Sequence, residues 1–186
     1  HDLDELNSEH AWTSCLSDAG LLVPEAVATK NGEAYATVSF EDSDEYRYVG
    51  LVKWIEGIIL DDLILDLEEK GVGDLYESLG KVVAKFHKAT VAWEVPEDFK
   101  RHSFDTEGFL GDQPFWGRFW EVKNATNSER KKLTLIRKNI TKTLSQLPRD
   151  INYFGVIHAD MHSKNVLIQE ESLSVIDFDD AGFGWY

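Results

Sequence analysis

Two short stretches near the end of the chain decide the fold. The first is a polar loop between two apolar runs, and it reads His158-Ala159-Asp160-Met161-His162-Ser163-Lys164-Asn165. After a turn around residues 169–172 the sequence predicts a short strand over 173–176, which leads into Asp177-Phe178-Asp179-Asp180. Because the loop and the second strand are linked by that turn, we expect both sets of carboxylates at one end of a hairpin.

These side-chain types suit phosphoryl transfer. A carboxylate accepts or orients the proton of the attacking hydroxyl, while an amide and a second carboxylate hold a metal ion against the phosphates. We therefore predict Asp160 as the catalytic base, with Asn165 and Asp177 as metal ligands. His158 is expected to pack beneath the loop and bond its backbone, and His162 can face phosphate or solvent.

Two other interpretations of the loop remain. A hairpin in which Asp160 and Asn165 only form turns would give a similar pattern. A zinc or iron site made of His158, Asp160 and His162 is permitted by their alternate spacing. The metal cluster leaves Asn165 and Asp177 without a role, so we rank it below phosphoryl transfer.

Composition and charge exclude some partners. The 186 residues include 19 basic and 34 acidic ones, for a formal net charge of -15. Such a charge repels nucleic-acid backbones and anionic membranes, so neither is expected as a partner. ATP remains compatible, because a metal ion held by carboxylates offsets its charge. Cys15 is the single cysteine and no apolar run is long enough to span a membrane, so we expect a cytoplasmic protein of undetermined oligomeric state.

The amino-terminal third predicts one helix followed by strands. A helix is expected over residues 4–16, with Glu9 inside its apolar stripe. Runs rich in β-branched and aromatic residues then predict strands over 26–29 and 34–40, paired as a hairpin through the Asn31-Gly32 turn, and a third strand over 48–55. Residues 41–45 are expected to form an acidic loop.

The remainder is mostly helical in pattern. Composition changes at residues 56–57, where we place a boundary between two lobes. Apolar residues at helical spacing predict one helix over 75–87 and another over 128–147, the latter stopped by Pro148. The aromatic-rich segment 99–121 is expected to pack an irregular loop onto a helical lobe, although it could stack a substrate ring.

The two motifs, over residues 158–165 and 175–184, resemble those of the aminoglycoside phosphotransferase and choline kinase superfamily. The resemblance extends over nearly the whole chain and is strongest to the bacterial branch with homoserine kinase type II and stress-response kinases. It implies a two-lobed, protein-kinase-like α+β fold, with the remainder of the small lobe in residues 1–56 and the first part of the helical lobe in 57–186.

The resemblance also implies roles for individual residues. Asp160 matches the family's catalytic base, and Asn165 and Asp177 match its magnesium ligands, with Asp179 as a further metal contact. Ala159 stands where most protein kinases have an arginine that grips a phosphorylated activation loop, so that control is expected to be absent.

Nucleotide contacts are implied in the amino-terminal lobe. Glu9 resembles the glutamate that pairs with the ATP-binding lysine. Residues 52–57 resemble the hinge, which places Lys53, Trp54 and Ile55 at the nucleotide. The family's glycine-rich loop and lysine precede the helix at which this chain starts, and its final helices follow the point where the chain stops. We therefore expect a fragment truncated at both ends and inactive alone.

The expected activity is that of the intact protein. It should use ATP and Mg²⁺ to move the γ-phosphoryl group onto a hydroxyl of a small molecule such as an amino alcohol, an aminoglycoside or an amino acid. One alternative is a protein serine/threonine kinase of the stress-response type. Another is a truncated or degenerate chain that binds partners without turnover.

Overall fold

The computed structural model describes residues 2–40, 44–65 and 67–186. The chain divides into two compact units, one formed by His1–Lys100 with His158–Ala181 and the other by Arg101–Ile157 with Gly182–Tyr186. Each contains helices and antiparallel strands, so the predicted α+β class is confirmed. The lobe boundary expected at residues 56–57 is a different kind of division and stays a prediction.

Within its described residues, the first unit contains nine elements. In chain order they are α1 (Leu3–Asp18), β1 (Tyr35–Ser39), β2 (Tyr46–Gly50), β3 (Ile58–Ile59), α2 (Leu60–Ile64), α3 (Glu69–Ala92), the 3-10 turn η2 (Ser163–Asn165), β5 (Val166–Gln169) and β6 (Ser172–Val175).

The first helix forms as its sequence predicts. α1 extends slightly beyond the predicted residues 4–16 because Asp2 and Glu5 make a capping box. The N–H of Glu5 donates to Oδ1 of Asp2 at 2.9 Å, and the N–H of Asp2 donates to Oε2 of Glu5 at 3.0 Å. Trp12 and Leu16 lie on the opposite side of that helix from solvent, with 1% and 0% of their surface exposed.

The predicted amino-terminal hairpin is wrong in its pairing. The Asn31-Gly32 turn does form, with the N–H of Gly32 donating to the carbonyl of Thr29 at 2.9 Å. Residues 26–29 form no strand, because Ala26 bridges Val52 and the N–H of Val27 donates to the carbonyl of Leu51 at 2.7 Å, whereas the N–H of Thr29 donates across the turn to the carbonyl of Glu33 at 2.8 Å. β1 pairs with β2 instead. The acidic loop predicted over 41–45 lies mainly outside the described residues.

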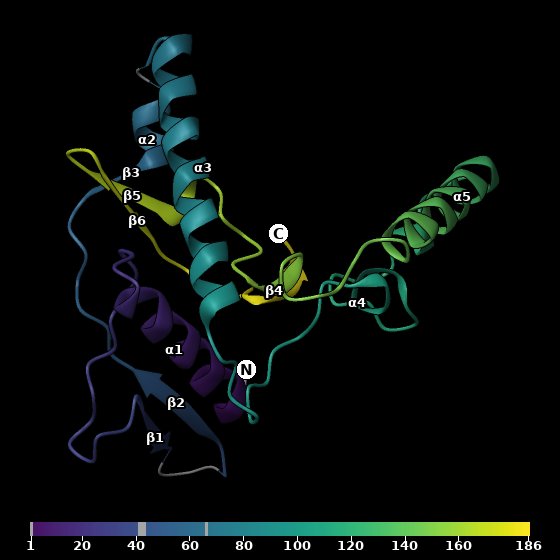
Figure 1. Ribbon diagram of the computed structural model, residues 1–186. Coiled ribbons are helices and arrows are strands. Elements are labelled where there is room, and N and C mark those ends of the chain that lie inside the picture. Colours follow the sequence, from purple (N-terminus) through teal and green to yellow (C-terminus); the bar gives the residue numbers. More distant parts are fainter. Residues whose placement is uncertain (1, 41–43, 66) are drawn as a thin grey trace. The chain divides into compact units, whose positions relative to one another are not determined.

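A small sheet and two helices share the core that supports the polar loop. β3, β5 and β6 form an antiparallel sheet in the order β3-β5-β6, and α2 and α3 lie beside it (Figure 1). Leu60 of α2, Leu79 of α3, Val166 of β5 and Leu173 of β6 are buried together. Burial of these apolar side chains stabilises a sheet whose strands are too short to be held by their hydrogen bonds alone.

The central helix is longer than predicted. α3 runs to Ala92, five residues beyond His87, where the apolar pattern had suggested its end. The extra turn is stabilised by α1, because Nε1 of Trp12 donates to Oγ1 of Thr90 at 3.0 Å and Thr90 is fully buried. His87 is half-buried, and burial lowers its pKa below the ordinary value.

The second unit has five elements of its own. They are α4 (Thr106–Leu110), the 3-10 turn η1 (Phe119–Glu121), α5 (Asn127–Leu144), β4 (Phe154–Ile157) and β7 (Gly182–Trp185), and β4 pairs antiparallel with β7. α5 matches the predicted helix within three residues at its end, and the capping box of Thr126 and Glu129 fixes its start. No helix in the described ranges is long and apolar enough to cross a bilayer.

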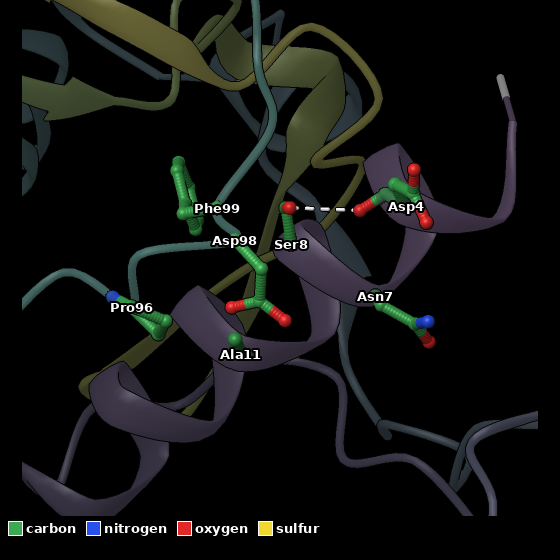
Figure 2. Close-up of a pocket in the computed structure, with 7 residues that line it drawn as sticks. All are labelled: Asp4, Asn7, Ser8, Ala11, Pro96, Asp98 and Phe99. Carbon is green, nitrogen blue, oxygen red and sulfur yellow. Dashed lines mark hydrogen bonds between the residues drawn. The ribbon is translucent and has the colours of Figure 1, made fainter.

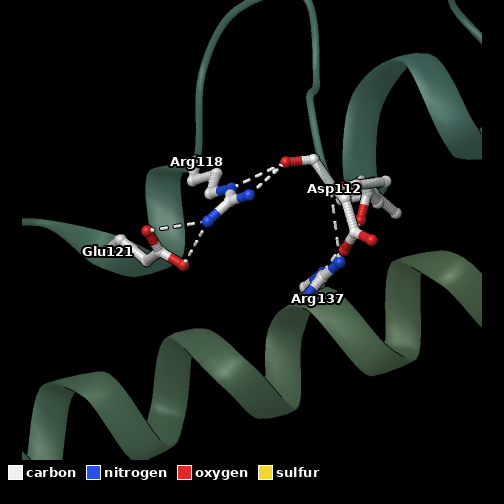
Figure 3. Close-up of polar contacts among 6 residues, drawn as sticks. Asp112, Arg118, Glu121 and Arg137 are labelled. Carbon is white, nitrogen blue, oxygen red and sulfur yellow. Dashed lines mark hydrogen bonds and ion pairs between the residues drawn. The ribbon is translucent and has the colours of Figure 1, made fainter.

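Aromatic and arginine side chains organise this second unit. Phe104 and Trp120 are 3% and 8% exposed, which favours packing over ring stacking with a substrate for the aromatic-rich segment. The guanidinium of Arg137 lies 3.9 Å from the Trp120 ring centre and donates through Nε to the carbonyl of Leu110 at 2.9 Å. Arg118 bridges the carbonyl of Asp112 and the carboxylate of Glu121 nearby (Figure 3).

Candidate active site

The polar loop, residues 158–165, is closed by a contact between its two most important predicted residues. Nδ2 of Asn165 donates to the main-chain oxygen of Asp160 at 3.0 Å and to its Oδ2 at 3.1 Å. Asn165 is 7% exposed, whereas 42% of the Asp160 side chain faces solvent. The arrangement therefore fixes an accessible carboxylate with a buried amide.

A second nitrogen lies beside the same carboxylate oxygen. Nδ1 of His162 accepts the N–H of Lys164 at 3.1 Å, so the neutral ring carries its proton on Nε2. That nitrogen lies 3.4 Å from Oδ2 of Asp160. Because Asn165 and His162 both approach Oδ2, the other oxygen of Asp160 is the one left to meet a reacting group.

His158 sits beneath the loop, as the sequence predicted for it. It is 4% exposed, its Nδ1 accepts the N–H of Asp160 at 3.3 Å, and its Nε2 lies 3.0 Å from the carbonyl of Ile176. Burial lowers the pKa of His158, although the bond to Ile176 and the charges of Asp160 and Asp177 oppose this. The ring is thus neutral and donates from Nε2.

Asp177 is delivered by the strand that follows. β5 and β6 pair with Val166 opposite Val175, and the N–H of Ile176 donates to the carbonyl of Asn165 at 2.9 Å. Asp177 therefore lies one residue beyond the partner of Asn165. Its φ is 65°, as is that of Ala159 in the polar loop. A non-glycine residue in this region costs about 1–3 kcal/mol, and such strain concentrates at functional sites.

Phe178 connects this end of the hairpin to the helices. Its ring centre lies 4.7 Å from that of His158, 5.5 Å from that of Trp12 and 6.2 Å from that of Phe86. No motif marks Trp12 in the sequence, although its spacing of four residues from Leu16 on α1 is typical of one buried helix face. Asp179, the further predicted metal contact, is exposed one residue beyond Phe178.

Glu9 lies one turn before Trp12 on α1. Its Oε2 is buried, which fits a carboxylate placed inside an apolar stripe. Lys53 lies in the hinge segment, residues 52–57, where its Nζ is 2.6 Å from Oε2 of Glu25. Trp54 is 84% exposed and Ile55 is half-buried. The nucleotide role of these four predicted residues stays a prediction.

The hinge segment is nevertheless tied to the strand that leaves the polar loop. It leads directly into β3, which pairs with β5 through Ile58 opposite Ile168 and Ile59 opposite Leu167. Sequence patterning missed β3, because a strand of two residues has no periodicity to detect.

The zinc or iron alternative finds no support in the described part of the chain. No three His, Cys, Asp or Glu side chains there come together as a metal site. Both ring nitrogens of His158 are engaged by main-chain groups, so the ring is not available as a ligand.

One hollow of about 370 Å³ lies between α1 and residues 96–99 (Figure 2). Ser8 at its wall is satisfied, because its Oγ donates to the carbonyl of Asp4 at 2.7 Å and accepts the N–H of Lys100 at 2.7 Å. Its other polar groups, including Asp98, are exposed to solvent. We assign it no part in the site.

Known proteins resemble this chain in sequence. Residues 1–186 match APH, the phosphotransferase enzyme family. Amicoumacin kinase of Bacillus subtilis (strain 168) is 24% identical over 113 residues, which cover 60% of this chain and 31% of that protein.

Solved structures extend the likeness to the whole chain. The microcompartment-associated aminopropanol kinase is 31% identical with a TM-score of 0.81, over 100% of this chain and 56% of that one. Amicoumacin kinase hAmiN in complex with AMP-PNP, Ca²⁺ and Ami is 19% identical with a TM-score of 0.75, over 100% of this chain and 51% of that one, a likeness of fold.

These likenesses confirm the predicted kinase-like fold. The chain spans about a third of the curated relative it matches and just over half of these solved structures. Since the family match runs through every residue of the sequence, the chain belongs to the phosphotransferase enzyme family.

Proposed function

We propose that the protein containing this chain transfers the γ-phosphoryl group of ATP to a hydroxyl of a small molecule. The observation that carries this proposal is the double contact of Asn165 with Asp160, at 3.0 and 3.1 Å. It places a fixed, solvent-accessible carboxylate next to an amide in the loop of a family of phosphotransferases. Positioning of this kind supplies most of the catalysis in phosphoryl transfer.

Asp160 acts as the base in this proposal. Its Oδ2 is held by Asn165, so its Oδ1 accepts the proton of the acceptor hydroxyl. The hydroxyl oxygen forms a bond to the γ-phosphorus as the bond from that phosphorus to the β,γ-bridging oxygen breaks. ADP leaves with the bridging electrons, and the proton remains on Asp160 until it passes to solvent.

The proposed metal is Mg²⁺, held by Asn165, Asp177 and Asp179. The donor set fits this ion, because it offers only carboxylate and amide oxygens. Nδ2 of Asn165 makes both of its hydrogen bonds to Asp160, so Oδ1 of Asn165 remains as the amide atom that would bind the metal. When bound, the ion neutralises charge on the phosphates.

The proposed nucleotide contacts are Glu9 and the hinge residues Lys53, Trp54 and Ile55. Support comes from the short path between hinge and loop: β3 follows the hinge segment and pairs with β5, which begins directly after Asn165. A nucleotide bound at the hinge segment would thus be positioned by the same small sheet that fixes Asp160. We place the protein in the cytoplasm, where ATP is available.

A small-molecule acceptor is favoured over a protein. The relatives named above are an aminopropanol kinase and amicoumacin kinases, which suggests an amino alcohol or a related amine-bearing hydroxyl compound. Ala159, which adopts a φ of 65°, offers no cation to a phosphorylated activation loop.

The test is an acceptor screen with γ-labelled ATP and the whole protein. Amino alcohols, aminoglycosides, amino acids and a generic protein substrate are compared, with and without Mg²⁺. The proposal requires metal-dependent label in a small molecule that disappears in Asp160→Asn. Label confined to polypeptide would favour a protein kinase, and no label with ATP still bound would favour a binding module.

A further inference from the structure

The polar loop is anchored to a helix far from it in sequence. Oγ of Ser163 donates to Oδ1 of Asp61 at 2.6 Å, in a partly buried contact between residues 102 positions apart. Asp61 is the second residue of α2. No motif in the sequence pointed to Asp61, and Ser163 stood in the loop without a role.

Asp61 is itself held in place from two sides. Its neighbour Leu60 is fully buried in one core with Val166, the residue that follows Asn165. β3 ends at the residue before Leu60 and pairs with β5, placing Ile59 opposite Leu167. The carboxylate of Asp61 is therefore fixed relative to the strand that leaves the polar loop.

Ser163 lies where a constraint on the loop is most effective. It begins the 3-10 turn that ends at Asn165. Within the loop, the N–H of Asn165 donates to the carbonyl of His162 at 2.9 Å, and the N–H of His162 donates to that of Asp160 at 2.9 Å. A shift of Ser163 would thus move the amide of Asn165 away from Asp160.

We propose that Asp61 and Ser163 form a positioning pair that keeps Asn165 against Asp160. The inference rests on the proposed function, and neither residue touches the reacting atoms. A hydrogen bond to an ionised carboxylate is stronger than one between neutral groups, so a single bond can hold this turn. If the pair acts in this way, its loss slows the chemical step in protein that is still folded and still binds ATP.

The kinetic test uses the whole protein and its best acceptor from the screen. Ser163→Ala and Asp61→Ala should each lower kcat about tenfold, while KM for ATP changes less than about twofold. The double variant should be no slower than either single one, because both remove the same bond. Asp61→Asn, which keeps an acceptor oxygen, should recover most of the rate.

Asp62→Ala is the matched control, since Asp62 is the exposed neighbour of Asp61 on α2. Its kcat should stay within about twofold of wild type. Single variants that lower the melting temperature but leave kcat unchanged would reduce the pair to a structural contact and overturn the inference. Additive losses in the double variant would do the same.

Amide hydrogen exchange separates this inference from the proposed function. In Asp61→Ala the amides of His162 and Asn165 should exchange at least about fivefold faster than in Asp62→Ala, while amides in the middle of α3 do not change. Unchanged loop exchange overturns the positioning pair even if the protein is an active kinase. If the wild-type protein shows no turnover but loop amides still exchange faster in Asp61→Ala than in Asp62→Ala, the positioning pair is supported and the proposed function is contradicted.

Discussion

The polar loop and the hinge segment belong to the same compact unit, yet they are held in opposite ways. The loop is fixed by buried groups: Asn165 is 7% exposed and His158 is 4% exposed. The hinge segment has Trp54 at 84% exposure, and Lys53 is held by an ion pair with Glu25 at the surface. An exposed ion pair of this kind contributes little to stability, about 1 kcal/mol or less.

The two segments therefore differ in how far their geometry is fixed before a ligand binds. The loop carries its own hydrogen bonds to Asp160, so its geometry exists before any ligand arrives. Preorganisation of this kind is what electrostatic catalysis requires. The hinge segment instead presents exposed apolar surface, such as the ring of Trp54.

The largest expected effect comes from replacing Asp160, the proposed catalytic base of the polar loop. Asp160→Asn in the whole protein should lower kcat about 10³-fold, or about 4 kcal/mol, because it removes the proton acceptor while keeping the shape. ATP affinity should change little. Rates with labelled ATP and binding by calorimetry check the two halves of this statement. A rate within tenfold of wild type would contradict the role of Asp160.

The side chains that support the loop from beneath give the next largest effect. Trp12→Ala should lower the free energy of unfolding by about 3 kcal/mol, because Trp12 is 1% exposed and packs against Phe178 and Phe86. Urea unfolding measures it. Trp12→Phe keeps an aromatic ring but loses the bond to Thr90, so it should cost less. Equal losses in both variants would assign the effect to the hydrogen bond alone.

Much of the loop could be predicted because its information is local. His158, Asp160 and Asn165 lie within eight residues, and the turn back to Asp177 fixes the hairpin that presents them. Their residue types and spacing, together with the Asp177 that follows, predict phosphoryl transfer, and the structure brings Asp160 and Asn165 into contact. The roles themselves stay predictions.

Pairing between distant segments could not be predicted in the same way. The strand at 26–29 was assigned to the next segment along the chain, but Ala26 meets Val52. Asp61 carried no signal, since one carboxylate on a short helix resembles any solvated residue until Ser163 is placed beside it. Local propensity does not encode such partners, which depend on packing.

A smaller effect is expected on the pH dependence of the unfolding free energy, through the buried His158 beneath the polar loop. The pKa of His158 is lowered from 6.5 by burial, so the unfolded chain takes up this proton first as pH falls. The contribution is fully present above about pH 6.5 and declines as pH falls towards the folded pKa. Between pH 7.5 and 5, wild type should lose more unfolding free energy than His158→Gln.

The half-buried His87 provides a comparison for that measurement. Burial also lowers the pKa of His87, but it lies inside α3 and not under the loop. His87→Gln should flatten the pH dependence of unfolding less than His158→Gln. Equal effects would mean that the loop environment adds nothing to ordinary burial.

The smallest expected effect on stability tests the hinge segment. Trp54→Ala should change the free energy of unfolding by less than about 0.5 kcal/mol, because the ring is 84% exposed. The same change should weaken ATP binding about fivefold if the ring packs on the adenine, the size of one aromatic stacking contact. Leu65→Ala, at an 83% exposed position, is the matched control and should leave ATP affinity unchanged. A loss of stability without a loss of ATP affinity would contradict a place for Trp54 in the nucleotide site. It would also mean that the hinge segment, like the polar loop, is held by contacts within the protein.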